Sequence, residues 1–598
     1  MDESLKRNKL AKKSLNHEQL FAMDANAAQA LFNKLSLEEK VAIVLNTPWE
    51  KRQQLILLAD NSQALVQGLP DEEIYWTIKE TGTADALPVI ARTSFEQFQY
   101  IIDIDCWQKD RIDMEQVMEW LQLMLRCNEA KVLEWLTNTD ELFLNYVFKK
   151  LFTISKISED IDLAEASDSL PQWTLDGRYY FQFANDEARL VSIPFLHLLY
   201  KTNSKLFYYM MDNTIWSFET ELEDDLFRLR QSRIAEKGFP ELDEALQVYQ
   251  YLSPEHIKTV LSDQEFFGHA TAEGKSAPLT LRYSIGTEHP ALFLQDILAV
   301  IDNSQIIDRI QREIIHLSNQ VMIADGREAR EIQDLKKSLR KVLGYANIGL
   351  ELLSKRDTRT AAEIMEAAPM QFLFRAGYSQ GLDLKNRLEQ LHKIQWQNCR
   401  PFRPLFFDGP WGATIEGLSQ VRPVYFEGNS KPDSFLFRDF ESIAEICVTR
   451  QVLDIVGVAE KVLFELLGVD IHNLRDAGAA LADSQTISAR SVFMTALAQH
   501  VVHGVSKFAP VTATELKKFL AAVFIKNQDA EPAFILSTVF CRETIAWLNS
   551  QLDTLEDEAA ALTTFVESCF SLLQDQCGSI AGIEQIDTRF VTAFIFRK

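Results

Sequence analysis

The stretch that decides the fold is Asp113-Met-Glu-Gln-Val-Met-Glu-Trp-Leu-Gln-Leu-Met-Leu125. Its apolar side chains recur three, four, seven and eleven residues after the first, which places them on one face of a helix. They are Met114, Val117, Met118, Leu121 and Leu125. A single short helix cannot bury such a stripe, so we expect neighbouring helices to stack against it.

Helix start signals recur before this stretch. Ser36-Leu-Glu-Glu39 is a capping-box pattern, and Thr47-Pro-Trp-Glu50 repeats it with proline at the first helical position. Pro70 opens a third helix, and Ser94-Phe-Glu-Gln97 is a further capping box. The second, third and fourth signals are marked by Pro48, Pro70 and Ser94, which are 22 and 24 residues apart. Each interval has room for two short helices. The spacing predicts a helical-repeat superhelix over residues 30–165.

Aromatic residues alternate around an Asp-Gly pair in residues 173–183, Trp-Thr-Leu-Asp-Gly-Arg-Tyr-Tyr-Phe-Gln-Phe. This pair favours the positive backbone dihedrals of a two-residue hairpin turn. The flanking patterns are helical, over 187–265 and 288–395, with a Gly/Pro-rich loop predicted at 268–290. We therefore expect an all-α, multi-domain protein with at most one small β-hairpin.

Residues 396–435 depart from the helical pattern, because five of the 17 prolines lie there with four glycines and many aromatic residues. Long irregular segments of compact domains are often functional. Helical periodicity returns near Ser434, and Thr512-Ala-Thr-Glu515 is another capping box. The predicted division is a basic helical or frayed amino terminus (1–29), the superhelix (30–165), a central helical domain with the hairpin (166–395) and a carboxyl-terminal helical domain that opens with this segment (396–598).

Composition excludes several classes of protein. Of the 598 residues, 61 are Lys or Arg and 86 are Asp or Glu, so the net charge is −25. Such a surface repels nucleic-acid phosphates and anionic membranes. Seven cysteines without a C-x-x-C pair indicate reduced thiols, and neither a signal peptide nor a span long enough to cross a bilayer is recognised. We expect a cytoplasmic protein with no nucleic-acid partner, no membrane insertion and no cofactor.

Arginine residues flank the Pro/Gly/aromatic segment. Guanidinium groups beside aromatic rings suit an anionic or phosphorylated ligand. The alternative is that these arginines hold an irregular loop by bonding its orphan carbonyl groups. The candidate ligand-binding residues are Arg400, Arg403, Trp411, Arg422 and Arg438.

Acidic residues gather in Asp103-Ile-Asp-Cys-Trp-Gln-Lys-Asp110, between two expected helices. Carboxylate oxygens are the ligands that Mg²⁺ and Ca²⁺ prefer, so Asp103, Asp105 and Asp110 are candidate metal ligands. The loop lacks the glycine and the terminal glutamate of a calcium-binding loop. The alternative is that these aspartates cap helices.

The Leu/Pro-Glu-Glu and Leu-Leu pattern of residues 30–150 resembles the cytosolic amino-terminal superhelix of MgtE-type magnesium channels. No channel segment accompanies it, so the resemblance implies a fold and not transport. Over nearly the whole chain, three patterns look like a bacterial family of uncharacterised cytoplasmic proteins, and they imply no activity. These patterns are Asp105-Cys-Trp107 followed by the Trp120 helix, Arg233-Ile-Ala-Glu-Lys-Gly-Phe-Pro240 and Gly409-Pro-Trp-Gly412.

Stacked helical repeats present an extended surface for partners. No P-loop, G-x-G-x-x-G, G-x-S-x-G or kinase signature is found in the sequence. We therefore expect a protein-interaction scaffold or regulatory adaptor with a protein partner, and we favour a non-enzyme. The alternative is an anionic-ligand-binding protein or enzyme that uses residues 396–440. The sequence leaves the oligomeric state open.

Overall fold

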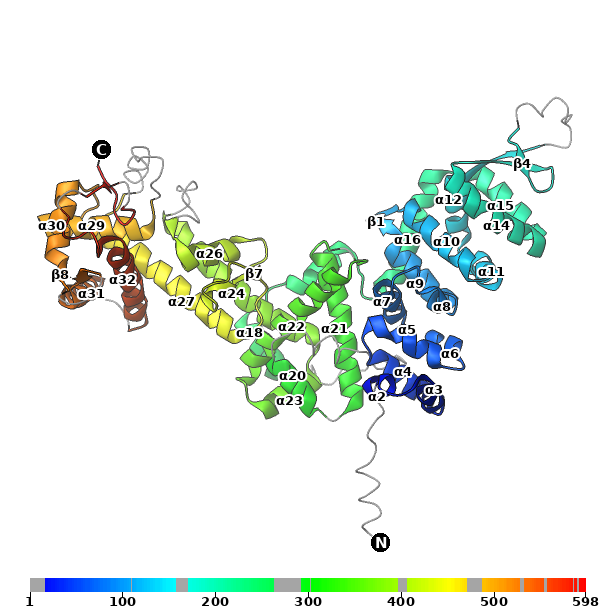
Figure 1. Ribbon diagram of the computed structural model, residues 1–598, viewed down its shortest axis with the longest axis horizontal. Coiled ribbons are helices and arrows are strands. Elements are labelled where there is room, and N and C mark those ends of the chain that lie inside the picture. The colour runs from blue at the N-terminus through cyan, green and yellow to red at the C-terminus, as the bar shows by residue number, and fades with distance from the viewer. Residues whose placement is uncertain are drawn as a thin grey trace, which may run out of the picture. The chain divides into compact units, whose positions relative to one another are not determined.

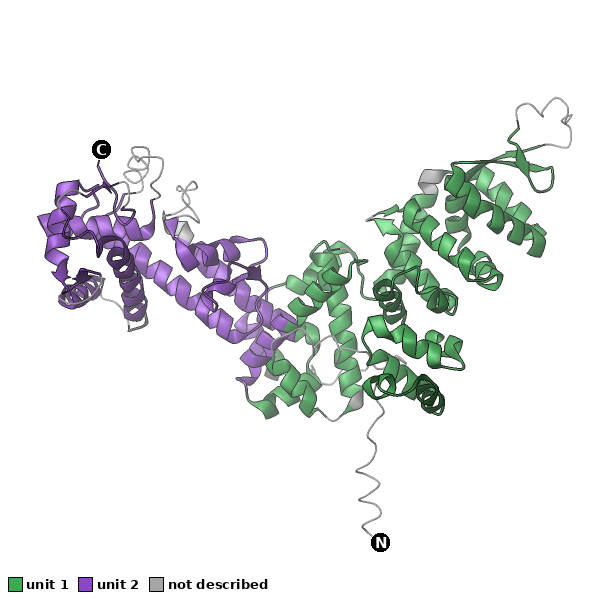
Figure 2. Cartoon of the chain, viewed as in Figure 1, with its two compact units in different colours: residues 1–250, 260–343, 357–372 green, residues 251–259, 344–356, 373–598 purple. Residues whose placement is uncertain are grey.

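The structure is a computed structural model that describes residues 17–108, 110–157, 170–262, 292–301, 303–327, 329–395, 406–470, 487–527, 532–552, 556–583, 586–588 and 591–597. These residues are mostly helical, and their strands are short and antiparallel, so the all-α expectation is confirmed. The chain divides into two compact units (Figure 2). Unit 1 comprises residues 1–250, 260–343 and 357–372, and unit 2 comprises residues 251–259, 344–356 and 373–598. The four-part division expected from the sequence stays a prediction.

Unit 1 begins with a run of short helices (Figure 1). They are α2 (His17–Phe21), α3 (Ala25–Asn33), α4 (Leu37–Leu45), α5 (Trp49–Leu58), α6 (Ser62–Gln67), α7 (Asp71–Thr81), α8 (Leu87–Ile90), α9 (Phe95–Asp105), α10 (Met114–Cys127), α11 (Glu129–Asn138) and α12 (Glu141–Leu151). Helix α3 packs on α5, α5 on α7, α7 on α9 and α9 on α11. In the same way α4 packs on α6, and α8 on α10. Helices two apart in the chain are thus neighbours in space.

Side-chain caps set most of the predicted helix starts. The capping boxes at Ser36, Ser94 and Thr512 are formed, and Asp113 caps α10. The box predicted at Thr47 is wrong, because Pro48 is the residue that precedes the first turn of α5 and it has no side chain to cap with. The Thr47 hydroxyl instead donates a hydrogen bond to the Ile43 carbonyl oxygen at 2.7 Å.

The stripe on α10 is buried as expected, with Val117 and Leu121 inside and its three other members partly buried. Trp120 and Met124 are buried as well, so the buried face is wider than the stripe alone. Neighbouring helices α8, α9, α11 and α14 (Asp186–Thr202) cover it.

The predicted hairpin is present, but its two-residue turn is not, because the four residues 175–178 separate the strands. Gly177 in this connection has a φ of +72°. Strand β4 (Trp173–Thr174) pairs with β5 (Tyr179–Phe183), and β3 (Phe152–Lys156) extends the sheet in the order β3-β5-β4. Three further strand pairs were not expected, because strands of two or three residues are too short to show alternation. They are β1 (Trp107–Gln108) with β2 (Arg111–Ile112), β6 (Tyr425–Phe426) with β7 (Phe437–Arg438), and β8 (Phe524–Lys526) with β9 (Phe534–Leu536).

The remaining described part of unit 1 is mainly helical. Within it, α14 packs on α15, and α12 contacts α14, α15 and α16. The loop predicted at 268–290 lies outside the described residues. The remaining elements are α15 (Ser204–Trp216), α16 (Glu219–Ala235), α17 (Leu242–Ala245), η1 (Leu246–Tyr249), α20 (Phe293–Val300), α21 (Ser304–Ala324), the first part of α22 (Ile332–Ser354) and α23 (Thr358–Ala367).

Unit 2 is built around a close crossing of the second part of α22 with α24 (Met370–Gln395). Glycines make the crossing possible, because a Cβ at Gly349 would overlap the Leu373 carbonyl and one at Gly377 the Tyr345 carbonyl. The other helices in the described residues of the unit are α18 (Pro254–Ser262), which begins in it, α26 (Gly409–Ser419), η3 (Glu427–Asn429), α27 (Ile443–Glu460), the π-helix η4 (Lys461–Leu466), α29 (Ala489–His503), α30 (Ala513–Val523), α31 (Thr538–Leu552) and α32 (Glu556–Cys577).

The segment predicted to be irregular over 396–435 contains the helix α26, so that part of the prediction is wrong. Pro410 stands in the first turn of α26, where a missing backbone N–H leaves no helical bond unmade. Residues 396–405 lie outside the described part of the chain. Among the residues that the structure does describe, no helix combines the length and apolarity needed to cross a membrane.

Candidate functional site

Asp105, at the end of α9, has both carboxylate oxygens engaged. Its Oδ1 accepts hydrogen bonds from Tyr75 Oη and Lys79 Nζ, each at 2.9 Å, and its Oδ2 accepts one from Trp120 Nε1 at 2.8 Å. The side chain is only 1 % exposed. A buried carboxylate with this many donors ties α7, α9 and α10 together.

Asp103, two residues earlier on α9, receives its donors mainly from α16. Arg233 donates hydrogen bonds from Nε and Nη2 to the two carboxylate oxygens, both at 2.7 Å, and Arg230 Nε donates to the Asp103 carbonyl at 2.7 Å. The Arg230 guanidinium also lies over the Trp107 ring, 5.1 Å from its centroid. Burial lowers the pKa of Arg230 to about 10. Bidentate and stacked arginine contacts fix α16 against α9.

The predicted metal ligands are therefore placed in different surroundings. Asp103 and Asp105 are buried and bonded to nitrogen and hydroxyl donors, whereas Asp110 is exposed in the loop between β1 and β2. No group of three or more His, Cys, Asp or Glu side chains suited to a metal occurs in the described ranges. The geometry favours a structural role for the first two residues, and metal binding there stays a prediction.

The predicted anion-binding residues lie in unit 2. Arg438 on β7 bonds Glu427 at 2.8 Å and Glu445 at 2.6 Å, and its guanidinium is 5.0 Å from the centroid of the Tyr425 ring. Trp411 is 7 % exposed, and its ring centroid is 5.8 Å from that of Phe565. Arg422 is half-buried just after α26, and Arg400 and Arg403 lie outside the described residues. Arg438 and Trp411 thus make internal contacts, and the ligand-binding prediction is untested.

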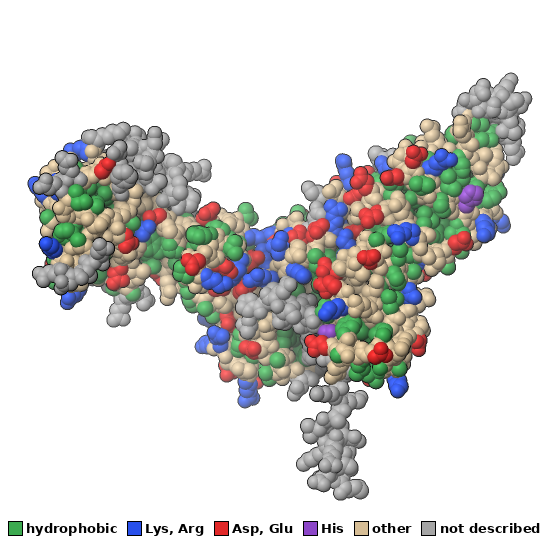
Figure 3. All heavy atoms as spheres, viewed as in Figure 1, with side chains coloured by type: hydrophobic (Ala, Val, Ile, Leu, Met, Phe, Trp, Pro, Cys, Tyr) green, Lys and Arg blue, Asp and Glu red, His purple; other side chains and the backbone are tan. Residues whose placement is uncertain are grey.

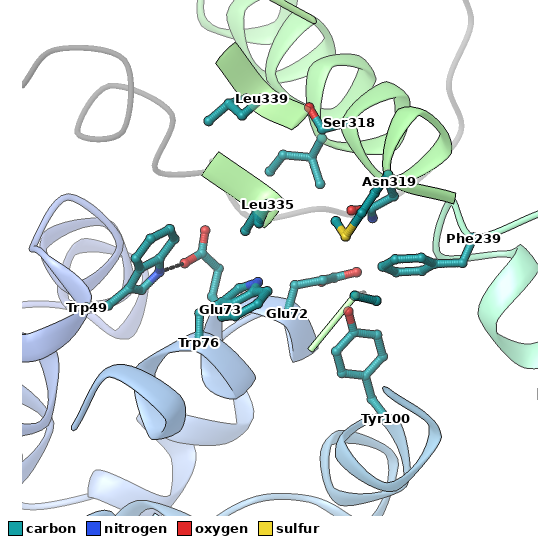
Figure 4. Close-up of a pocket in the computed structure, with 13 residues that line it drawn as sticks. Trp49, Glu72, Glu73, Trp76, Tyr100, Phe239, Ser318, Asn319, Leu335 and Leu339 are labelled. Atoms are coloured by element: carbon teal, nitrogen blue, oxygen red, sulfur yellow. Dashed lines mark hydrogen bonds between the residues drawn. The ribbon is translucent and has the colours of Figure 1, made fainter. Parts of the chain in front are cut away.

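A pocket in unit 1 was not foreseen from the sequence. It lies among α5, α7, α9, α21 and α22, and the space open to water-sized molecules is about 50 Å³ (Figure 4). Its aromatic walls are Trp49, Trp76, Tyr100 and Phe239, and α21 and α22 add Met322 and Leu339. A cavity needs about 10–15 Å³ by this measure to hold one water molecule, so the pocket accommodates a small ligand group. We call it the Glu72 pocket.

Glu72 projects into this pocket from the first turn of α7 (Figure 4). Within the described residues it has no ion-pair partner, and the hydrogen-bond donor to its carboxylate is its own backbone N–H rather than another side chain. Burial raises the pKa of Glu72, and this effect outweighs the lowering by its own backbone amide and by Lys237. The Lys237 ammonium is bonded to Asp71 Oδ2 at 2.7 Å instead. The carboxylate is therefore half-buried without a direct counter-charge.

The adjacent Glu73, unlike Glu72, has side-chain partners. Its Oε2 accepts a hydrogen bond from Trp49 Nε1 at 2.8 Å and is paired with the buried Arg52. Arg52 also donates to the Thr47 and Leu45 carbonyls at 2.8 and 3.0 Å. The Glu73 pair orients the indole of Trp49 at the edge of the pocket, 6.4 Å from the Trp76 ring between centroids.

The segment 233–240 joins these features. Arg233 holds Asp103, Lys237 holds Asp71, and Phe239 lines the Glu72 pocket. Gly238 has a φ of +88°, and a Cβ there would stand 2.8 Å from His316 Nδ1. A side chain at this position is disfavoured both by the backbone angle and by α21, so glycine permits the turn that delivers Phe239.

The Glu72 pocket is not predictable from the sequence, because its walls come from distant parts of the chain. Residues 70–73, Pro-Asp-Glu-Glu, indicate only a helix start, and nothing in the sequence relates them to residues 318–339 on α21 and α22. The pattern at residues 233–240 includes Phe239, which lines the pocket, and its first residue, Arg233, bonds Asp103.

The family model that matches residues 29–597 is described as a family of unknown function (DUF6178). The chain belongs to this family. The match covers nearly the whole sequence, which agrees with the uncharacterised family expected from the sequence patterns. No curated protein and no solved structure matches the chain.

Proposed function

We propose that this DUF6178 member is a cytoplasmic helical-repeat protein that acts as a protein-interaction scaffold or regulatory adaptor. The packing of α3, α5, α7, α9 and α11 on one another, each against the next but one in the chain, supports the repeat interpretation. Stacked helix pairs bury one face and leave the other for partners.

The observation that carries the proposal is a set of three exposed apolar side chains, one on each of α14 and α15 and one just before α16. Leu190, Trp216 and Phe218 are 73, 79 and 70 % exposed. Leu190 and Trp216 lie equally far from the turn at Asn203, so antiparallel packing brings them to the same end of the hairpin. We call these three residues the docking end. Exposed apolar patches mark interaction sites, and tryptophan is enriched among the residues that contribute most to binding.

Charge indicates the chemistry of the partner. Asp224 and Asp225, which follow the docking end on α16, are both exposed. Figure 3 shows apolar side chains among charged ones on the visible face of unit 1. With a net charge of −25 on the chain, the fitting partner is a protein segment whose apolar side chains are flanked by Lys or Arg.

The test compares three full-length proteins, the wild type, the double variant Trp216→Ala/Phe218→Ser and the control Leu242→Ser. Leu242 is 54 % exposed on α17, away from the docking end. Each protein is crosslinked in its native cells, and the captured proteins are quantified by mass spectrometry. We expect a near-stoichiometric partner to fall at least tenfold with the double variant only, and its segment to bind the purified wild type.

A loss of binding in the double variant would not be caused by unfolding, because substitutions at exposed positions change the free energy of unfolding by less than about 0.5 kcal/mol. Ser at position 218, the residue before α16, is also a favoured helix cap. Equal capture by all three proteins, or no stoichiometric partner at all, would overturn the proposal. The alternative of an anionic ligand at 396–440 gains no support from the described residues, because Arg438 is engaged by glutamates.

A further inference from the structure

We propose that the Glu72 pocket of unit 1 binds a small organic ammonium ion, with the Glu72 carboxylate as its counter-ion. This site is separate from the docking end, and the proposal does not depend on the scaffold function.

The polar atoms of the pocket suit an ammonium group. Tyr100 Oη has no hydrogen-bond partner within the described residues, and Asn319 Nδ2 donates to the Lys237 carbonyl at 3.0 Å, which leaves Asn319 Oδ1 as an acceptor. Figure 4 shows the Glu72 carboxylate, the Tyr100 hydroxyl and the Asn319 amide directed into the same part of the pocket. A primary ammonium has three N–H donors and no acceptor, so three oxygen acceptors match it.

The aromatic walls favour a cation as well. Trp76 and Tyr100 are each 6 % exposed, and Trp49 borders the same space. Ring faces attract ammonium groups electrostatically, more strongly where water is excluded. Such walls combined with one carboxylate are typical of organic cation sites, whereas Mg²⁺ or Ca²⁺ requires about six or more oxygen ligands.

The apolar residues and the size of the pocket limit the ligand. Phe239, Met322 and Leu339 offer only carbon and sulfur contacts, which suit a methyl or methylene group next to the nitrogen. The open space of about 50 Å³ is one third of an engineered cavity of about 150 Å³ that holds benzene. The ligand class is therefore a short alkylammonium, or the ammonium end of a longer chain.

Among the described residues, no cationic side chain is bonded to the Glu72 carboxylate. Lys237 is the cationic group that lowers the pKa of Glu72, and its ammonium is bonded to Asp71 at 2.7 Å. Arg52 is paired with Glu73. Burial raises the pKa of Glu72, which means that the ionised carboxylate is under-compensated, and a bound cation removes this deficit.

The test is saturation-transfer NMR on the full-length protein with ethylammonium chloride as the probe. Ethanol is the neutral comparison of nearly equal size, and sodium chloride keeps the ionic strength constant. We expect saturable binding of ethylammonium and at least tenfold weaker binding of ethanol. In Glu72→Gln, ethylammonium binding falls at least tenfold, because the isosteric amide removes the charge.

Two further variants keep the test decisive. Glu38→Gln removes the same charge from an exposed position on α4 and should leave binding unchanged. Ala329→Leu narrows the pocket without changing its charge and should also weaken binding at least tenfold. Thermal melts confirm that each variant is folded. Equal binding of ethanol and ethylammonium, or binding that survives Glu72→Gln, would overturn the proposal.

Discussion

Asp105 and Glu72 belong to helices that pack on each other in unit 1, and the fold treats their carboxylates in opposite ways. Asp105 receives three donors and is almost completely buried, while Glu72 receives no side-chain donor from the described residues and faces the aromatic pocket. A buried carboxylate that is saturated by donors stabilises the fold and is closed to ligands. A carboxylate that is buried without a counter-charge is costly to ionise and remains open to a cation.

The largest effect on the free energy of unfolding is expected from Asp105→Asn, which tests whether the Asp105 carboxylate stabilises the fold. The amide turns one acceptor into an N–H donor that faces the donors of Tyr75, Lys79 or Trp120, so buried polar groups lose their partners. We expect a loss of about 3 kcal/mol in the free energy of unfolding, the range for one partner removed from a buried pair. Urea unfolding followed by tryptophan fluorescence measures it, because seven of the ten tryptophans belong to unit 1.

The matched control is Asp110→Asn, which changes an exposed aspartate in the same part of the chain. It should alter the free energy of unfolding by less than about 0.5 kcal/mol. If both variants behaved alike, Asp105 would not be the structural centre inferred here. The same two proteins test the metal prediction, because a Mg²⁺-dependent rise in melting temperature that both variants abolish would restore the cation site.

A smaller effect is expected from Arg233→Met. The substitution keeps much of the apolar length of the side chain but removes the bidentate contact to Asp103. Because the Arg233 side chain is 38 % exposed, solvent screens the pair, and we expect a loss of about 1 kcal/mol. Arg228→Met on the same helix is the control, since its side chain is 80 % exposed. Equal losses in the two variants would show that the contact between Arg233 and Asp103 does not contribute to the free energy of unfolding.

The helical part of the fold was predictable because its signals are local. The stripe on α10 and the capping boxes at Ser36 and Ser94 each occupy only a few consecutive residues, and the structure confirms them. The box at Thr47 failed for an equally local reason, since a proline took the capping position.

The Glu72 pocket depends on non-local packing. Nothing near Glu72 in the sequence shows that Asn319 faces it across 247 residues of chain. The aspartates at 103 and 105 were recognised as unusual, but the sequence cannot tell metal ligands from arginine partners. That distinction depends on where α16 places Arg233.

The smallest effect, and the sharpest test of the comparison, is the pH dependence of Glu72→Gln. Burial raises the pKa of Glu72 above its ordinary value of 4.5, so the folded protein holds this proton more tightly than the unfolded chain does. Below the unfolded pKa both states are protonated and the variant should match the wild type. As pH rises towards the folded pKa, the unfolded chain ionises first, and the wild type loses stability that the variant keeps.

Urea unfolding at about pH 4 and about pH 8 should therefore give equal stabilities at the lower pH and a more stable variant at the higher one. Asp71, Glu73, Tyr100 and Lys237, the charged and titratable groups around Glu72, are the same in both proteins, so the difference isolates this carboxylate. Ethylammonium should narrow the gap at high pH, because it stabilises only the protein with the ionised carboxylate. If Glu72→Gln were less stable than the wild type at high pH, the ionised Glu72 carboxylate would stabilise the fold, as that of Asp105 does, and the comparison would fail.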